Sequence, residues 1–118
     1  MNSETAAMKS LFLVRSEHLT HEGTLFGGDL MAEIDTLAYC LLRTTFPGKS
    51  FVTRVAEIAF EHPAKLGDVI VFEARTIKEG TTSIHVEVSG AVGEERISVA
   101  KVVFVRVDSQ GRKMPISA

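Results

Sequence analysis

Three glycines and one aspartate are the residues whose types and spacing most suggest chemistry. Gly23, Gly27 and Gly28 form a glycine-rich loop, and Asp35 follows two helical turns later. Glycine has no Cβ, so the backbone can turn tightly here and approach a ligand closely. Amides at the start of a following helix would point outward without partners, and such amides bind anions and polarised carbonyl oxygens. We therefore expect a site that binds an acyl group and acts on it.

Asp35 is the candidate acid or base of this site. At about 100° per residue, it points beside Met31 and Leu42 at the margin of an apolar face, whereas Glu33 lies on the opposite, solvated side. A carboxylate at such a margin is partly desolvated, which suits general acid–base catalysis. The alternative is a boundary aspartate that hydrogen-bonds a neighbouring loop.

A helix must position both features. Apolar residues recur from Gly28 to about Arg43 in the i, i+3, i+4, i+7 pattern of a half-buried helix. Pro47 and Gly48 end this pattern, because proline disfavours helix at the residue before it. Cys40, in the middle of the helix, is expected to be a small packing residue.

Strands account for most of the remaining chain. Their patterns predict strands at residues 11–14, 50–61, 69–78, 82–92 and 97–107, followed by a loose polar tail over 108–118. The last four strands are joined by short turns, so we expect antiparallel neighbours. The sequence therefore predicts an α+β domain, in which one long helix covers a curved five-stranded antiparallel sheet.

Length and composition narrow the class of protein. A chain of 118 residues predicts a single domain over 1–118, and a net charge of −2 argues against non-specific nucleic-acid binding. No apolar run approaches the roughly 20 residues that cross a bilayer, and no signal peptide is visible. One cysteine fits a reducing compartment, so we expect a cytoplasmic protein. Exposed sheet edges predict at least a homodimer.

Several segments together resemble the hot-dog-fold acyl-CoA thioesterases, in the branch of the broad-specificity bacterial hydrolases and their eukaryotic long-chain cytosolic relatives. The motif that carries the resemblance is Gly23-Thr24-Leu25-Phe26-Gly27-Gly28, then Leu30-Met31, then Asp35. Phe60-Glu61-His62-Pro63, Gly67-Asp68 and Gly80-Thr81-Thr82-Ser83 extend it over most of the chain from about Leu11 to Met114.

The resemblance implies a hot-dog fold, dimers with composite sites at the subunit interface, frequent assembly into hexamers, and hydrolysis of an acyl-CoA thioester. Gly27 and Gly28 would hold the thioester carbonyl oxygen at the helix N-terminus. Asp35, facing the loop of the partner subunit, would act as general base or nucleophile. No cofactor is expected beyond the coenzyme A that forms part of the substrate.

Candidate substrate contacts come from the motif itself, from one later turn and from the basic residues of the chain. Gly23, Phe26 and Gly27 would line the thioester site, and Arg54 would meet a phosphate. The expected turn between the strands at 69–78 and 82–92 would offer backbone amides and hydroxyls from Gly80, Thr81, Thr82 and Ser83. Lys78, Arg112 and Lys113 are further phosphate candidates. His18 and His21 with Glu17 and Glu22 come from one short loop and lack the spacing of a zinc site, so no metal is expected.

One position departs from the family pattern. Thr20 stands where this branch usually has an asparagine, and a hydroxyl lacks the paired donor and acceptor of an amide. Thr20 could serve in reduced form, or His18, His21 or Glu22 could share its task. The second hypothesis is therefore an acyl-CoA binding or sensing module with little turnover. A hot-dog hydratase or dehydratase is disfavoured, because those usually use a histidine and this helix has none.

Overall fold

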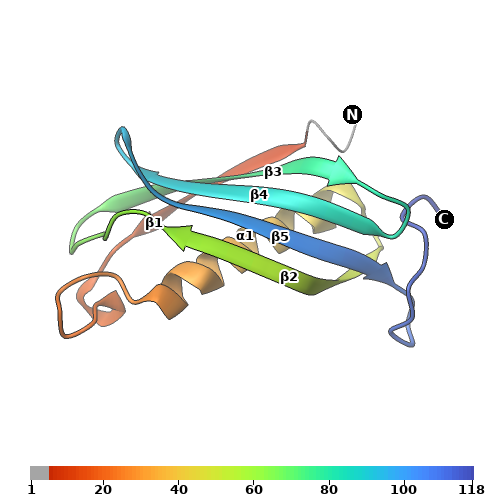
Figure 1. The fold of residues 1–118 in the computed structure, drawn as a ribbon, viewed down its shortest axis with the longest axis horizontal. Coiled ribbons are helices and arrows are strands. Elements are labelled where there is room, and N and C mark those ends of the chain that lie inside the picture. The colour runs from red at the N-terminus through yellow and green to blue at the C-terminus, as the bar shows by residue number, and fades with distance from the viewer. Residues whose placement is uncertain (1–5) are drawn as a thin grey trace.

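One antiparallel sheet and one long helix make up the fold (Figure 1). The computed structural model describes residues 6–118. Its elements are β1 (Ala7–Leu13), the short 3₁₀ helix η2 (Ser16–His18), α1 (Gly27–Thr45), β2 (Ser50–Phe60), β3 (Val69–Glu79), β4 (Ser83–Val92) and β5 (Glu95–Val107). The sheet order is β1-β3-β4-β5-β2, and the predicted α+β architecture is confirmed.

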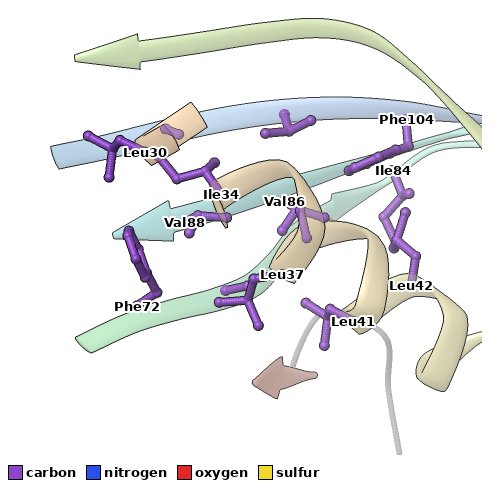
Figure 2. Packing of buried hydrophobic residues seen from close by; sticks show 14 of the residues in the cluster. Leu30, Ile34, Leu37, Leu41, Leu42, Phe72, Ile84, Val86, Val88 and Phe104 are labelled. Carbon is purple, nitrogen blue, oxygen red and sulfur yellow. The ribbon is translucent and has the colours of Figure 1, made fainter. Parts of the chain in front are cut away.

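The core lies between α1 and the sheet face that it covers (Figure 2). On β4, buried residues alternate with half-buried ones, as expected for a strand with one face in the core. Helical spacing puts one stripe of α1 against this face. The stripe consists of Leu30, Ile34, Leu37, Ala38, Leu41 and Leu42, and it packs on Phe72, Ile84, Val86, Val88 and Phe104. Cys40, expected to pack inside, is exposed.

Two expectations about the strands were wrong. β1 begins at Ala7 rather than Leu11, because the alternation of exposed and half-buried residues extends back through the polar residues that precede the apolar run. β2 pairs with β5 and not with β3. Residues 61–68 are too long for a tight hairpin and carry the chain across to the other side of the sheet, whereas the short turns before and after β4 do join antiparallel neighbours.

The tail is ordered, contrary to the expectation of a loose segment. Asp108 accepts backbone hydrogen bonds from Gln110 and Arg112 at 2.8 and 2.9 Å. These bonds, chiefly the one from Arg112, lower the pKa of the Asp108 carboxyl below its ordinary value. Ile116 is only 1% exposed, and its amide donates to the Thr81 carbonyl. An Asp-centred turn and one buried apolar anchor therefore fix a segment that is mostly polar.

The helix does not cover the sheet evenly. Residues 52–57 of β2 are all exposed, on both faces of the strand, while the inward residues of β1 are half-buried. The uncovered β2 edge borders the candidate site.

Between residues 6 and 118, no helix combines the length and apolarity needed to cross a bilayer.

Candidate active site

The start of α1 presents free amides. Phe26 is the N-cap residue, with an extended backbone (φ −64°, ψ 130°) and no side-chain cap. Within the described chain, the amides of Gly27 and Gly28 have no acceptor, because the first turn is closed by Asp29 and Leu30 donating to the Phe26 carbonyl. The helix N-terminus is therefore open to an oxygen of a ligand.

The three glycines have different structural tasks. Gly23 has φ +80° and makes the tight turn expected of it, whereas Gly27 and Gly28 are helical and have no positive φ. At Gly28 a Cβ would lie 2.4 Å from the Phe26 ring, and at Gly27 it would lie 3.7 Å from Cζ of Phe60. The absence of a side chain at Gly28 thus makes room for the Phe26 ring, whereas a Cβ at Gly27 would only touch the Phe60 ring at an ordinary contact distance.

The glycine-rich loop is tied to its surroundings by backbone hydrogen bonds. The Leu25 amide donates to the Ala64 carbonyl, and the Phe26 amide donates to the His18 carbonyl, both at 2.8 Å. Thr24 also forms a bridge with Lys65. The helix start is therefore held in place against the segment that follows β2.

The polar residues of the loop make contacts within the loop itself. Thr20 is half-buried, and its hydroxyl accepts a hydrogen bond from the Glu22 amide at 3.2 Å. His18 Nδ1 accepts from the Arg15 amide at 3.0 Å. The His21 side chain is exposed and lies 3.1 Å from the Glu22 carboxylate. The structure brings these groups together in one loop but shows none of them in contact with Asp35.

Asp35 does not have the surroundings that helical periodicity suggested. It is exposed in this single chain, and Glu33 is half-buried, the reverse of the expectation. The reason is the sheet: α1 packs over its other strands, while the side of the helix bearing Asp35 faces the uncovered β2. There, Thr53 Oγ1 donates to Asp35 Oδ1 across 3.4 Å, a long distance for a hydroxyl–carboxylate hydrogen bond.

Thr53 is the site residue that sequence reasoning missed. It faces the same side of β2 as Phe51, since Phe51 pairs with Arg106 and Thr53 with Phe104. The period-2 pattern from the buried Phe51 already puts a hydroxyl on the inner face. Nothing in the sequence, however, indicates that this part of the strand runs beside Asp35.

A pocket of about 360 Å³ opens beside the helix start. It lies between the first turn of α1, the segment after β2 and the beginning of β5. Most of its walls are apolar. They include Leu25, Gly27, Leu30, Phe60, Pro63, Ala64 and Ile97, with Glu61 and His62 among the remaining lining residues.

Paired charges mark the polar side of this pocket. Arg96 donates to both carboxylate oxygens of Glu61, at 2.6 and 3.0 Å. These hydrogen bonds lower the pKa of the Glu61 carboxyl from its ordinary value. His62 Nδ1 lies 4.0 Å from the Glu95 carboxylate. Glu61 and Arg96 thus neutralise each other, and His62 lies beside a carboxylate of the adjoining strand.

The remaining predicted substrate contacts lie elsewhere in the chain. Arg54 is exposed at the irregularity of β2 between Thr53 and Val55. The turn from Gly80 to Ser83 lies at the opposite end of the molecule from the glycine-rich loop (Figure 1). In that turn the Gly80 amide donates to the Ser83 carbonyl at 2.7 Å. One chain therefore does not bring the predicted coenzyme A turn to the predicted thioester site.

Several proteins similar in sequence to this chain are named as enzymes. The acyl-CoA thioester hydrolase YciA of Salmonella typhimurium is 31% identical over 103 residues, which cover 80% of this chain and 77% of that protein. The rat acetyl-coenzyme A thioesterase is 30% identical over 113 residues, covering 88% of this chain but 20% of the much longer rat protein.

Solved structures are similar over nearly the whole chain. The acyl-CoA hydrolase of Staphylococcus aureus, in complex with butyryl coenzyme A, coenzyme A and coenzyme A disulfide, superposes with a TM-score of 0.84 at 26% identity. The match covers 96% of this chain and 70% of that one. The family model of the thioesterase superfamily matches residues 22–98, and the hot-dog resemblance is confirmed. The chain belongs to the thioesterase superfamily.

Proposed function

We propose that this protein hydrolyses the thioester of acyl-CoA to a free carboxylic acid and coenzyme A. The observation that carries the proposal is the open start of α1, where the Gly27 and Gly28 amides lie beside an apolar pocket while Asp35 projects from the same helix. The names of the relatives, acyl-CoA thioester hydrolase and acetyl-coenzyme A thioesterase, support the same reaction class.

The chemistry assigns one role to each group. The Gly27 and Gly28 amides stabilise the negative charge that develops on the thioester oxygen, a contribution of about 3–4 kcal/mol per donor in comparable sites. Asp35 either accepts a proton from the attacking water or attacks the carbonyl carbon itself. In the first route the proton is passed on to the departing sulfur, so the C–S bond breaks and coenzyme A leaves as the thiol. In the second route coenzyme A leaves as the thiolate and takes up a proton from water, and a water molecule then hydrolyses the acyl–Asp35 anhydride to the free acid and the Asp35 carboxylate. Thr53 orients the Asp35 carboxylate through its hydroxyl.

The amides and the carboxylate of one chain are too far apart to act on one thioester. Gly28 and Asp35 are separated by seven residues, and at 1.5 Å per residue this is about 10 Å along the helix axis. An oxyanion donor must lie about 3 Å from the oxygen, and an attacking group must lie at about 3–3.5 Å. The proposed site therefore combines Gly27 and Gly28 of one copy with Asp35 of a second copy.

A two-fold dimer through β2 provides this combination. Gly28, Met31 and Asp35 lie along one side of α1 at i, i+3 and i+7. Met31 is 48% exposed and sits midway between the other two. A two-fold axis near Met31 would put each Gly28 opposite the partner's Asp35, and would cover the exposed residues of β2.

The same symmetry would also complete the coenzyme A contacts. Antiparallel pairing of the two β2 strands brings the Gly80–Ser83 turn of one copy to the end that holds the glycine-rich loop of the other. Arg54, at the β2 edge, would lie in the same interface. We propose at least a homodimer in the cytoplasm; the hexamers implied by the family resemblance would need further contacts between dimers.

Three structures of the Staphylococcus aureus hydrolase carry alanine in place of an aspartate, a threonine and an asparagine. In that protein, the spacing between the asparagine and the aspartate equals the spacing between Thr20 and Asp35 here. The equal spacing supports Asp35 as the catalytic carboxylate. The spacing from the aspartate to the threonine differs by one residue from that between Asp35 and Thr53, so the proposed role of Thr53 rests on its contact with Asp35. It also supports the alignment of Thr20 with the asparagine of that hydrolase.

Thr20 favours a second candidate function. Its hydroxyl is occupied by the Glu22 amide, so it offers less to a water or a carbonyl than an asparagine amide would. A protein that binds acyl-CoA with little turnover would fit this arrangement. In that case Thr20→Asn would raise the rate of hydrolysis.

Thiol release from acyl-CoAs of two to sixteen carbons tests the proposal. We expect turnover in the wild type and a loss of about 10²–10⁴-fold in Asp35→Asn. Glu33→Gln is the matched control, since it neutralises a carboxylate on the same helix away from β2, and it should keep its activity. Binding of acyl-CoA without turnover in the wild type would contradict the proposed hydrolase activity and favour the sensing module.

A further inference from the structure

The pocket beside the start of α1 is apolar where a thioester carbonyl would bind. Gly27 forms part of its wall, and so do Leu30 and Ile97, which belong to the core. If the thioester carbonyl oxygen accepts a hydrogen bond from the Gly27 amide, the acyl chain attached to that carbonyl would enter apolar space within one or two bonds. The volume of about 360 Å³ is at the small end of the roughly 300–1,000 Å³ usual for ligand pockets.

The charges of this pocket do not suit the nucleotide end of coenzyme A. No lysine or arginine belongs to its lining. The nearby Arg96 has two hydrogen bonds to Glu61, and His62 lies against Glu95. A phosphate would have to displace the Glu61 carboxylate from Arg96, the cation that stands beside this pocket. An uncharged, apolar group meets no such obstacle.

We propose that this pocket binds the acyl chain of the substrate, and that Phe60 and Ala64 set how much of the chain it accepts. The inference rests on the proposed function, because it takes acyl-CoA as the ligand. Phe60 is 54% exposed, and its ring lies over Gly27, so it bounds the open side of the pocket. Ala64 is 3% exposed and forms an inner wall. The pocket size selects short and medium-length acyl groups.

Binding measurements on Asp35→Asn test the inference without any need for turnover. Affinities are measured for free coenzyme A and for butyryl-, octanoyl- and palmitoyl-CoA. Each buried methylene should raise affinity by about fourfold until the pocket is full. The gain of an acyl-CoA over free coenzyme A then reports the acyl pocket alone.

Two variants in the same background change the pocket in opposite directions. Ala64→Leu fills it, so the gain for octanoyl-CoA should fall by at least tenfold while affinity for free coenzyme A stays within twofold. Phe60→Ala opens it, so the gain should extend to palmitoyl-CoA. Leu11→Ala removes an exposed apolar side chain from the far edge strand and should change neither quantity.

The two variants also distinguish the acyl chain from the rest of the ligand. Equal losses for free coenzyme A and for every acyl-CoA would overturn the inference, because the pocket would then hold the pantetheine arm. Unchanged acyl gains in both variants would overturn it as well. Phe60→Ala alters an exposed side chain and should fold, so it tests the inference even if Ala64→Leu does not fold. Failure of the proposed function appears separately, as an absence of thiol release by the wild type.

Discussion

The two edges of the sheet differ in how they are covered. On β1, exposed residues alternate with half-buried ones, because the residues of its inner face pack against the core. On β2, residues 52–57 are exposed on both faces. Both strands have an unpaired edge, but only β2 runs beside Asp35 through its Thr53 contact. The comparison favours β2, rather than β1, as the edge that the proposed dimer would cover.

A charge placed at the β2 edge should have the largest effect on the dimer and on activity. Val55 is 46% exposed in the middle of β2, and Val55→Glu would bring like charges together across a two-fold axis. We expect a monomer in light scattering and a loss of activity of at least 100-fold. Leu11→Glu, at 72% exposure on β1, is the matched control and should remain an active dimer. A dimeric, active Val55→Glu protein would remove the distinction between the edges.

Gly27→Pro tests the helix start without disturbing the helix. Phe26 already has the extended conformation that a following proline requires, and proline is favoured at the first helical position. The substitution removes one oxyanion donor, so kcat should fall by about 10²–10³-fold. Circular dichroism and the dimer mass should not change. An unaltered kcat would exclude the Gly27 amide as a donor.

Thr53 provides a smaller effect on the β2 side of the site. Thr53→Ala removes the hydroxyl that donates to Asp35, and kcat should fall by about tenfold, in line with the loss of one hydrogen bond to a charged group. Thr53→Ser keeps the hydroxyl and should keep most of the activity. Equal losses in both variants would indicate that the methyl group, rather than the hydroxyl, matters.

The smallest effect concerns the tail, at the end away from the glycine-rich loop. The lowered pKa of Asp108 means that its carboxylate stabilises the fold above the unfolded pKa of about 4, and that this contribution is lost as the pH falls through the folded value. Urea unfolding should therefore show Asp108→Asn less stable than wild type at pH 7, with the difference shrinking at pH 3. The group is exposed, so the difference is small, and the dimer should persist. A difference that grows on acidification would contradict this account.

Local pattern predicted much of the fold. The apolar periodicity and the Pro47-Gly48 stop predicted α1 to within two residues of its bounds, and strand alternation predicted β2, β3 and β4 nearly as well. These features depend on neighbours in the sequence. The ordered tail was missed because its stability comes from one buried side chain, Ile116, and from hydrogen bonds that composition does not reveal.

The site was less predictable, because it depends on contacts between distant segments. The motif alone identified Asp35 and the two helical glycines as candidates. Which face of α1 would be covered depended on β2 pairing with β5, and this pairing put Thr53 beside Asp35. The predicted desolvation of Asp35 in one chain was wrong for the same reason, since the side of the helix that bears Asp35 faces a stretch of β2 whose residues are themselves exposed.

Complementation between two inactive variants tests the central claim most directly. Asp35→Asn and Gly27→Pro chains are unfolded and refolded together in equal amounts. If each site takes its carboxylate from one copy and its amides from the other, mixed dimers contain one intact site. Half the dimers are mixed, so about a quarter of wild-type activity should return. Activity no higher than the average of the two variants refolded alone would show that each chain acts by itself, and would contradict the composite site.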